Sequence, residues 1–296
     1  MKFSEIYNNS DKPVISFEIF PPKTANGIEK LKTVLSELSL LSPDFITVTY
    51  GAMGTTRDKT IDIANYIKNQ LKIETACHLT CVGANRKEID LFLTKIMNYE
   101  IDNIVALRGD PPAGEKDFVP PDDGYTYANE LVHHIRGFEK RNTKFNVNFG
   151  IAIAGYPEKH LEAPNLTTDL ENLKKKVDAG ADIIITQLFF DNSHYFEYVK
   201  KVRDIGIDIP VIPGLMPILS SKQIMKITTM CGTNFPETLK NKLENSADHD
   251  AYAEELGITQ CINQAKDLLD NGAPGIHFYV LNKSTHIKRI LNTITQ

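Results

Sequence analysis

The sequence predicts a single (β/α)₈ barrel, of class α/β, that spans residues 1–296. Eight short segments rich in β-branched residues alternate with segments of helical periodicity, which indicates parallel strands joined by helices. Eight is also the number of parallel strands that closes a barrel of this kind. An open doubly wound sheet would require a glycine-rich G-x-G-x-x-G loop after an early strand, and the chain contains no such motif.

The strands are expected, in chain order, at residues 14–20, 45–50, 74–82, 103–108, 146–154, 182–189, 210–215 and 275–281. Apolar residues then recur every three or four positions, which predicts helices at 28–41, 59–71, 87–99, 129–138, 169–179, 194–205, 221–230 and 284–294. An additional helix is expected at 250–269, before the last strand.

The helix at 169–179 has recognisable ends. Thr168 and Glu171 have the spacing of a capping box at its start, and Gly180 is placed to end it. Glu171 and Lys175 are spaced for an i,i+4 ion pair within it.

Composition excludes several classes of protein. The formal net charge of −5 argues against a nucleic-acid surface, which requires a basic face. No apolar run approaches the roughly 20 residues that a membrane span needs, and the N-terminus lacks the apolar core of a signal peptide. Four cysteines are too few for a disulfide framework in a chain of this length, so we expect a cytoplasmic protein.

Cys77 and Cys81 are spaced C-x₃-C within a predicted strand. A metal site would need two further ligands, and His78 is the one obvious neighbour. Side chains alternate between the two faces of a strand, so His78 points away from both cysteines. We therefore expect buried thiols and no metal.

A barrel of this class carries its active site at the carboxyl ends of the strands. Almost every predicted strand ends in side chains that can ionise or form hydrogen bonds, which a purely structural barrel would not need. In strand order the residues at these ends are Glu18, Thr49 and Tyr50, His78, Arg108 to Asp110, Tyr156, Gln187, Pro213 and Gly214, and Tyr279.

Glu18 is the most informative of these residues. Alternation along its strand places Ile15, Phe17 and Ile19 on the face that packs against the helices. Ser16 and Glu18 then point into the barrel. Desolvation there is expected to raise the pKa of the Glu18 carboxyl, which suits a general acid. The alternative is a glutamate paired with a buried arginine or lysine.

Two other groups of residues allow two interpretations each. The run from Arg108 through Gly109 to Asp110 is either a ligand site, in which glycine allows close backbone approach, or a capped strand end. Asp169, Asn172 and Lys176 share one face of a predicted helix, which is either a solvated stripe or part of a site next to the strand end at Tyr156.

Eight motifs together resemble the methylenetetrahydrofolate reductase family, in order and over nearly the whole chain. The motifs are SFEIFPP (16–22), VTYGA (48–52), HLTC (78–81), ALRGD (106–110), AGYPE (154–158), TQLFFD (186–191), IPG (212–214) and HFYVLN (277–282). The chain is similar to the short bacterial members, which have the catalytic barrel alone. The resemblance therefore implies no inhibition by adenosylmethionine.

The resemblance implies an FAD-binding barrel that passes hydride from NADH or NADPH through the flavin to 5,10-methylenetetrahydrofolate, in a ping-pong reaction of one-carbon metabolism and methionine biosynthesis. It implies a homo-oligomer, a dimer or a tetramer. Glu18 and Asp110 would be catalytic. The folate would contact Asp110, Gln187, Gln223 and Tyr279. The implied FAD-binding residues are Thr49, Tyr50, Ala52, His78, Arg108, Gly109, Asp110, Tyr127, Ala128, Tyr156, His160, Ala163, Asp169, Asn172, Lys175 and Lys176.

The chain departs from the family pattern at two places. Ile227 stands where some members carry an aromatic residue that stacks on ligands, and the loop at 111–123, with its prolines and acids, differs from the usual run. Two other functions stay open from sequence: another flavin-dependent barrel, such as a proline dehydrogenase, and a folate carrier without turnover. The sequence does not distinguish NADH from NADPH.

Overall fold

The computed structural model describes residues 1–50, 55–111, 118–244 and 250–294. All strands in these ranges run parallel in one sheet, with the order β7-β6-β5-β4-β3-β2-β1-β9-β8. The strands are β1 (Val14–Ile19), β2 (Phe45–Val48), β3 (Glu74–Thr80), β4 (Asn103–Leu107), β5 (Gly150–Gly155), β6 (Ile183–Thr186), β7 (Val211–Ile212), β8 (Gly214–Leu215) and β9 (Gly275–Tyr279).

The predicted strand at 210–215 is divided in two at Pro213. β7 pairs with β6 on one side, and β8 pairs with β9 on the other. Proline has no N–H to donate to a ladder, so regular pairing breaks at this residue. Its carbonyl still accepts a hydrogen bond of 3.0 Å from the His277 N–H. The two halves thus close the ring, and the prediction of a (β/α)₈ barrel is confirmed.

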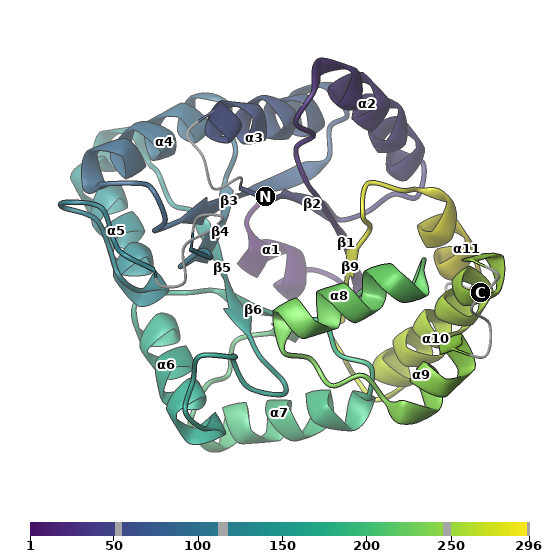
Figure 1. The fold of residues 1–296 in the computed structure, drawn as a ribbon. Helices are drawn as coiled ribbons and strands as arrows, with labels where there is room; N and C mark the ends of the chain where they lie inside the picture. Colours follow the sequence, from purple (N-terminus) through teal and green to yellow (C-terminus); the bar gives the residue numbers. More distant parts are fainter. Residues whose placement is uncertain (51–54, 112–117, 245–249, 295–296) are drawn as a thin grey trace.

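The helices surround the sheet, as Figure 1 shows. The outer helices are α2 (Ala25–Ser39), α3 (Thr55–Asn65), α4 (Arg86–Asn98), α5 (Ala128–Arg141), α6 (Leu166–Asp178), α7 (Asn192–Asp204), α10 (Asp250–Asp270) and α11 (Thr285–Ile294). α3 continues into a π-helical turn at Tyr66–Gln70, and a 3₁₀ turn follows α5 at Thr143–Phe145. Three further helices are α1 (Phe3–Asn8), α8 (Ser221–Cys231) and α9 (Glu237–Glu244), of which α1 and α9 were not predicted.

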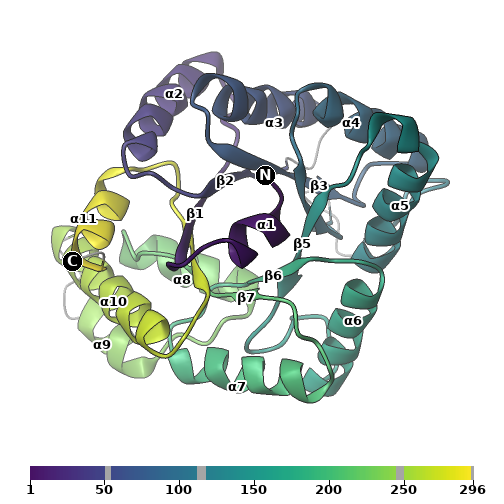
Figure 2. The same ribbon diagram turned by 180° about the vertical axis from the view of Figure 1, so that it is seen from behind.

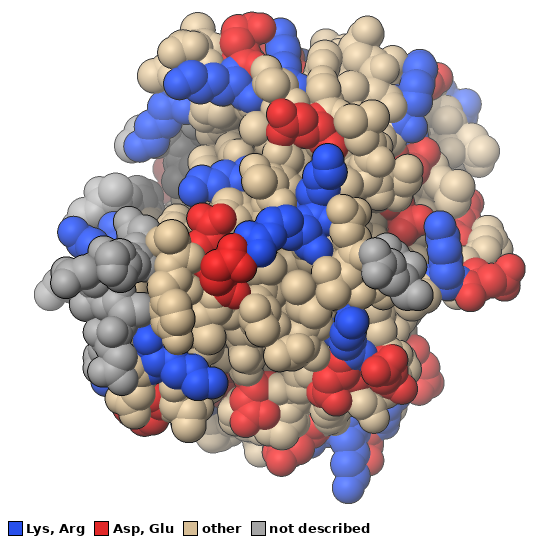
Figure 3. All heavy atoms as spheres, turned by 90° about the vertical axis from the view of Figure 1, so that its right-hand side faces the viewer, with Lys and Arg blue, Asp and Glu red and all other residues tan. Residues whose placement is uncertain are grey.

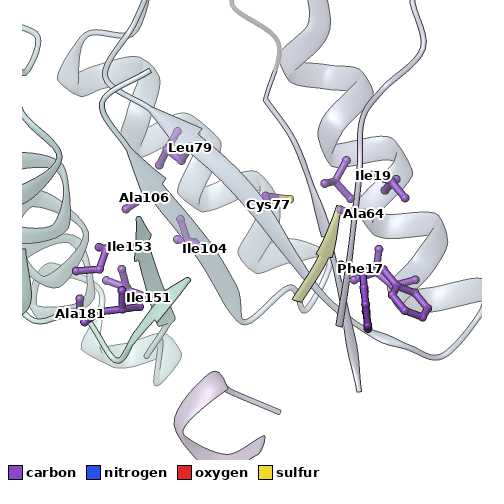
Figure 4. Packing of buried hydrophobic residues seen from close by; sticks show 14 of the residues in the cluster. Phe17, Ile19, Ala64, Cys77, Leu79, Ile104, Ala106, Ile151, Ile153 and Ala181 are labelled. Atoms are coloured by element: carbon purple, nitrogen blue, oxygen red, sulfur yellow. The ribbon is translucent and has the colours of Figure 1, made fainter. Parts of the chain in front are cut away.

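The main core lies between the strands and the surrounding helices. Phe17 and Ile19 of β1 are fully buried there, and Figure 4 shows them on the helix side of the strand, as alternation predicts. Cys77 and Cys81 belong to the same layer and are free, buried thiols. Burial raises the pKa of both thiols, that of Cys81 to about 12, so neither is a thiolate near neutral pH.

α1 closes the end of the barrel where the strands begin. In Figure 2 this short helix lies in front of the barrel opening, and α8 lies on the far side. Phe3 of α1 is fully buried, with its ring centroid 5.0 Å from that of Phe45 on β2. Its backbone N–H donates to Oδ1 of Asn103 on β4 at 2.8 Å. The opposite end, at the carboxyl ends of the strands, is thus the one available to ligands.

The start of α6 corrects one prediction. The helix begins at Leu166, three residues before the expected start, and the Thr168–Glu171 capping box is wrong. Asn165 is the N-cap, because its extended backbone lets the side-chain oxygen accept the Thr168 N–H at 2.8 Å. Gly180, with φ +118°, follows the C-cap residue Ala179 and ends the helix as predicted.

α8 crosses the barrel at the carboxyl ends of the strands (Figure 1). Together with α9 it packs on a separate apolar cluster that includes Phe190, Ile224 and Phe235. On the side of the molecule that carries α10 and α11, acidic and basic side chains are interspersed (Figure 3), consistent with the small net charge. No helix in the described ranges is both long enough and apolar enough to span a bilayer.

Candidate active site at the barrel mouth

Glu18 lies on the inner face of β1, between two imidazoles from neighbouring parts of the barrel. Its Oε2 atom is 3.2 Å from Nε2 of His78 on β3 and 3.6 Å from Nε2 of His277 on β9. The Thr47 hydroxyl donates to the same oxygen at 3.5 Å. Inward residues from alternate strands form one layer of a barrel, which explains why β1 and β3 bring Glu18 and His78 together.

The Glu18 carboxyl differs from the sequence prediction in its acidity. Desolvation raises its pKa, as expected, but the close imidazoles of His78 and His277 outweigh this effect and lower the pKa to about 2. The expected raised pKa is therefore wrong, because the prediction neglected the two imidazoles. The alternative partner, a buried arginine or lysine, is likewise replaced by histidines. Glu18 remains a fifth exposed, so a ligand in the mouth can reach it.

His277 and Ser16 form part of this group; Ser16 was predicted to point into the barrel, but neither residue was predicted to belong to the site. Both are fully buried, and the Ser16 hydroxyl lies 2.8 Å from Nδ1 of His277. Neither Nε2 of His277 nor Nε2 of His78 makes a well-aligned hydrogen bond within the described ranges. The same two-residue alternation that identifies Glu18 also places Ser16 and His277 inside the barrel, so a signal for them was present.

The end of β2 carries Thr49 and Tyr50, both half-buried. The Tyr50 ring packs edge-on against Phe92, and the Arg57 guanidinium lies 5.7 Å from its centroid. Its hydroxyl is buried without a hydrogen-bond partner in the described part of the chain. Desolvation, partly opposed by the charge of Arg57, raises the pKa of this hydroxyl to about 12, so it stays protonated. Ala52, also expected here, lies outside the described residues.

The end of β4 carries Arg108 and Gly109. Arg108 forms a bidentate ion pair with Glu162 of the β5–α6 loop, with N–O distances of 2.5 and 2.6 Å. Its guanidinium also lies 5.7 Å from the Phe118 ring centroid. Gly109 has φ +87°, and an added Cβ would lie 2.9 Å from Val82 Cγ2, so the position requires glycine. The backbone at Gly109 thus lies close to the Val82 side chain, and Glu162 holds the Arg108 guanidinium at the mouth.

The β5–α6 loop carries Tyr156, His160 and Ala163. The rings of Tyr156 and His160 meet edge-on at 4.7 Å. Lys159 has a positive φ of 93°, and its ammonium donates to the carbonyls of His160 at 2.9 Å, Leu161 at 3.3 Å and Ala163 at 2.5 Å. These three hydrogen bonds, called the Lys159 clamp below, fix the loop that carries His160 and Ala163. The sequence shows no periodic pattern from which these hydrogen bonds could have been predicted.

α6 settles the two interpretations of its polar face. The buried Asp169 carboxylate accepts the His160 N–H at 3.1 Å, and the Lys176 ammonium donates to the Ala154 carbonyl at 2.6 Å. Desolvation lowers the pKa of Lys176 to about 8, an effect that the charge of Asp169 partly opposes. Asn172 and Lys175 are exposed, and Lys175 donates to Asn172 Oδ1 at 3.1 Å. Asp169 and Lys176 therefore face the end of β5 rather than solvent.

Tyr127 and Ala128 lie at the start of α5. The Glu130 carboxylate accepts the N–H groups of Thr126 and Tyr127 at 2.8 and 2.9 Å, which fixes this turn. A cavity of about 620 Å³ lies between α5 and α6 and reaches Lys175. Its lining residues are Arg86, Tyr125, Asn129, Glu130, His133, Lys175, Asp178 and Ala179.

The four residues expected to contact the folate come from different elements. Asp110 and Gln223 are exposed, and Gln187 and Tyr279 are half-buried. The Tyr279 hydroxyl donates to the Thr186 carbonyl at 2.7 Å, and the Gln187 side-chain oxygen accepts the Leu188 N–H at 2.9 Å. The charge of Asp110 contributes to the raised pKa of Tyr156, although desolvation is the main cause.

These side chains suit a dinucleotide flavin cofactor. Lys176 is a half-buried cation with no carboxylate within ion-pair distance in the described ranges, and Arg108 adds a second cation. Tyr50 offers an unused buried hydroxyl. Large apolar side chains are also exposed in the segments that follow the strands; these are Phe20, Val119, Tyr127, Leu161 and Met230.

Comparison with known proteins agrees with this geometry. The family model described as methylenetetrahydrofolate reductase matches residues 2–295. The chain belongs to this family. The 5,10-methylenetetrahydrofolate reductase of Salmonella typhimurium is 37% identical over 281 residues, which cover 95% of this chain and 90% of that protein. The Escherichia coli enzyme of the same name is 35% identical over 280 residues, with the same coverage.

Plant relatives are longer than this chain. Methylenetetrahydrofolate reductase (NADH) 1 of Arabidopsis thaliana is 41% identical over 276 residues, which cover 90% of this chain but 46% of that protein. The chain thus spans about half the length of the plant relatives. Among solved structures, a Clostridium thermocellum protein described as binding two copies of 5-methyl-5,6,7,8-tetrahydrofolic acid has a TM-score of 0.62 at 20% identity, covering 98% of this chain and 96% of that one. That likeness shows the shared fold.

Proposed function

We propose that the protein reduces 5,10-methylenetetrahydrofolate to 5-methyltetrahydrofolate with NADH or NADPH, and that it holds FAD at the barrel mouth. Family membership supports the reaction. The structural observation that carries the proposal is the Glu18 carboxyl, which two imidazoles hold on the inner wall of a mouth lined by cations and exposed apolar side chains. The Arabidopsis relative is named for NADH, which makes NADH the first donor to test.

The cofactor is assigned to the side of the mouth formed by β4, β5, α5 and α6. Lys176 and Arg108 would neutralise the pyrophosphate, and the cavity that reaches Lys175 has room for part of a nucleotide. The Lys159 clamp would hold the backbone near His160 in its binding conformation before the cofactor arrives. FAD, when bound, supplies the hydride transfer between the nicotinamide and the folate.

Glu18 is assigned the proton transfer. Opening the five-membered ring of the substrate requires a proton on N10, and the product of that step is a cationic iminium at N5. The low pKa of Glu18 means that this carboxyl is ionised near neutral pH. Glu18 would therefore take up a proton before it passes one to N10, and His78 and His277 are the side chains placed beside it to relay that proton. Net turnover consumes one NAD(P)H and one proton.

Asp110 is assigned the stabilisation of the cationic iminium. Its carboxylate is exposed at the mouth and stands close enough to Tyr156 to affect the pKa of that residue. A fixed negative charge near a developing positive charge lowers the barrier without any proton transfer of its own. Gln187 and Tyr279 can both donate and accept, which suits the mixed edge of a pterin.

The proposal is tested by product analysis. The purified protein, supplied with FAD, is incubated with NADH and methylenetetrahydrofolate, and the folates are separated by chromatography. We expect 5-methyltetrahydrofolate equal to the NADH consumed. Folate binding without NADH consumption would identify a carrier, and reduction of the flavin by proline in place of NADH would identify a proline dehydrogenase. Either result would contradict the proposal.

A further inference from the structure

Phe20 carries a large, partly exposed aromatic side chain just beyond the carboxyl end of β1. It directly follows β1 and is 45% exposed, whereas its neighbour Ile19 is fully buried in the helix layer. Figure 4 shows Ile19 on the helix side of β1. By alternation Phe20 leaves the chain on the same side as Glu18, two residues nearer the opening. The site described above gives this exposed ring no role.

The backbone of Phe20 is held on both sides by one side chain. The Phe20 N–H donates to Oδ1 of Asn282 at 3.0 Å, and Nδ2 of Asn282 donates to the Phe20 carbonyl at 2.8 Å. The ladder between β1 and β9 continues to the bond from the Val280 N–H to the Glu18 carbonyl at 3.3 Å. Beyond that point the Asn282 amide replaces the missing strand, because it both donates and accepts.

The turn that aims Asn282 at Phe20 is strained. Leu281 and Asn282 have φ values of +51° and +53°, and the Lys283 N–H donates to the Val280 carbonyl at 2.9 Å. Positive φ at both central residues is the pattern of a type I′ turn, which favours asparagine followed by glycine. A leucine at the first position is unfavourable. Strain of this kind persists where the surrounding structure requires one geometry, and it clusters at functional sites.

We propose that Phe20 stacks on the aminobenzoyl ring of the folate, and that Asn282 is the positioning residue that holds Phe20 for this contact. The inference rests on the proposed function. The nitrogen that Glu18 is proposed to protonate, N10, carries the aminobenzoyl ring. Two residues along a strand span about 7 Å, which places Phe20 beside that ring when Glu18 reaches N10. α8, which crosses the mouth, contains no aromatic residue that could compete for this role.

The first test is the replacement of Phe20 by leucine, with tyrosine as the conservative variant. We expect Phe20→Leu to raise the KM for methylenetetrahydrofolate about three- to tenfold, with the effect on KM rather than on kcat. Phe20→Tyr should restore the wild-type KM. An unchanged KM in a folded Phe20→Leu protein would overturn the proposal, while absence of turnover in the wild type would instead refute the proposed function.

The second test separates positioning from stability. Asn282→Gly keeps the left-handed backbone and relieves strain, but loses both hydrogen bonds to Phe20. We expect it to raise the KM for the folate in the same direction as Phe20→Leu without lowering the melting temperature. Leu281→Gly is the matched control, since it relieves strain at the adjacent residue and keeps the amide; its KM should equal that of the wild type. Equal KM values for both variants would refute the role of Asn282.

A spectroscopic test does not depend on kinetics. The chain contains no tryptophan, so Phe20→Trp introduces a single indole reporter. In the FAD-loaded protein we expect 5-methyltetrahydrofolate to quench this emission, with a midpoint that matches the Kd for that ligand. Phe145→Trp, at an exposed site in the turn after α5, corrects for absorption by the ligand. Equal quenching of the two variants would mean that no ligand ring lies against residue 20.

Discussion

The N-terminal helix α1 should contribute a measurable share of the stability of the barrel. Phe3 is fully buried between the strand ends, and its ring contacts Phe45. Replacing a buried phenylalanine by alanine costs about 3–5 kcal/mol, because it removes apolar contacts and leaves a cavity. The unfolding entropy of about 2.1 cal/mol/K per residue gives roughly 0.6 kcal/mol/K for this chain. Phe3→Ala should therefore lower the melting temperature by about 5–8 °C.

Thermal unfolding followed by circular dichroism measures this shift. The control is Leu40→Ala, since Leu40 follows α2 and is 83% exposed, so its melting temperature should stay within about 1 °C of the wild type. Equal melting temperatures for Phe3→Ala and the Leu40→Ala control would mean that α1 does not seal this end of the barrel. The opposite end could then no longer be identified as the ligand entrance on this ground.

Three further predictions concern the site. Glu18→Gln should lower the rate of folate reduction by about 100-fold or more while bleaching of the flavin by NADH continues; equal losses in stopped-flow traces of the two half-reactions would refute its role as an acid. Asp110→Asn should slow folate reduction more than flavin reduction in the same experiment, and an unchanged folate rate would count against iminium stabilisation. Lys176 has a pKa of about 8 and loses its charge above that pH, so the Kd for FAD should rise between pH 7 and pH 9. Lys176→Met should abolish this dependence in a fluorescence titration, and an equal slope in the variant would assign it to another group.

Much of the fold could be predicted because parallel barrels repeat one pattern. Each strand is a run rich in β-branched residues, and in each following helix apolar residues recur every three or four positions. The exceptions have local causes. α1 is six residues long, too short to show a helical period, and its burial depends on strands distant in sequence. Pro213 interrupts a strand that still occupies its expected position. The start of α6 was misplaced because Asn165 competes with Thr168 for the same cap.

The candidate site was predictable where it depends on alternation, and not where it depends on neighbours. Glu18 could be placed inside the barrel from its own strand. The sign of its pKa shift could not, because it depends on His78 and His277, which only the strand order brings within 4 Å. The bidentate pair of Arg108 with Glu162 joins two loops, for which no sequence period exists.

An anaerobic two-step titration determines whether one site passes hydride from a nicotinamide donor through FAD to a folate. The purified protein, loaded with FAD, is titrated with NADH and then with methylenetetrahydrofolate while flavin absorbance is recorded. We expect NADH to bleach the absorbance and the folate to restore it in proportion to the amount added. A protein that binds no flavin, or a bleached flavin that methylenetetrahydrofolate leaves bleached, would contradict the proposed hydride transfer.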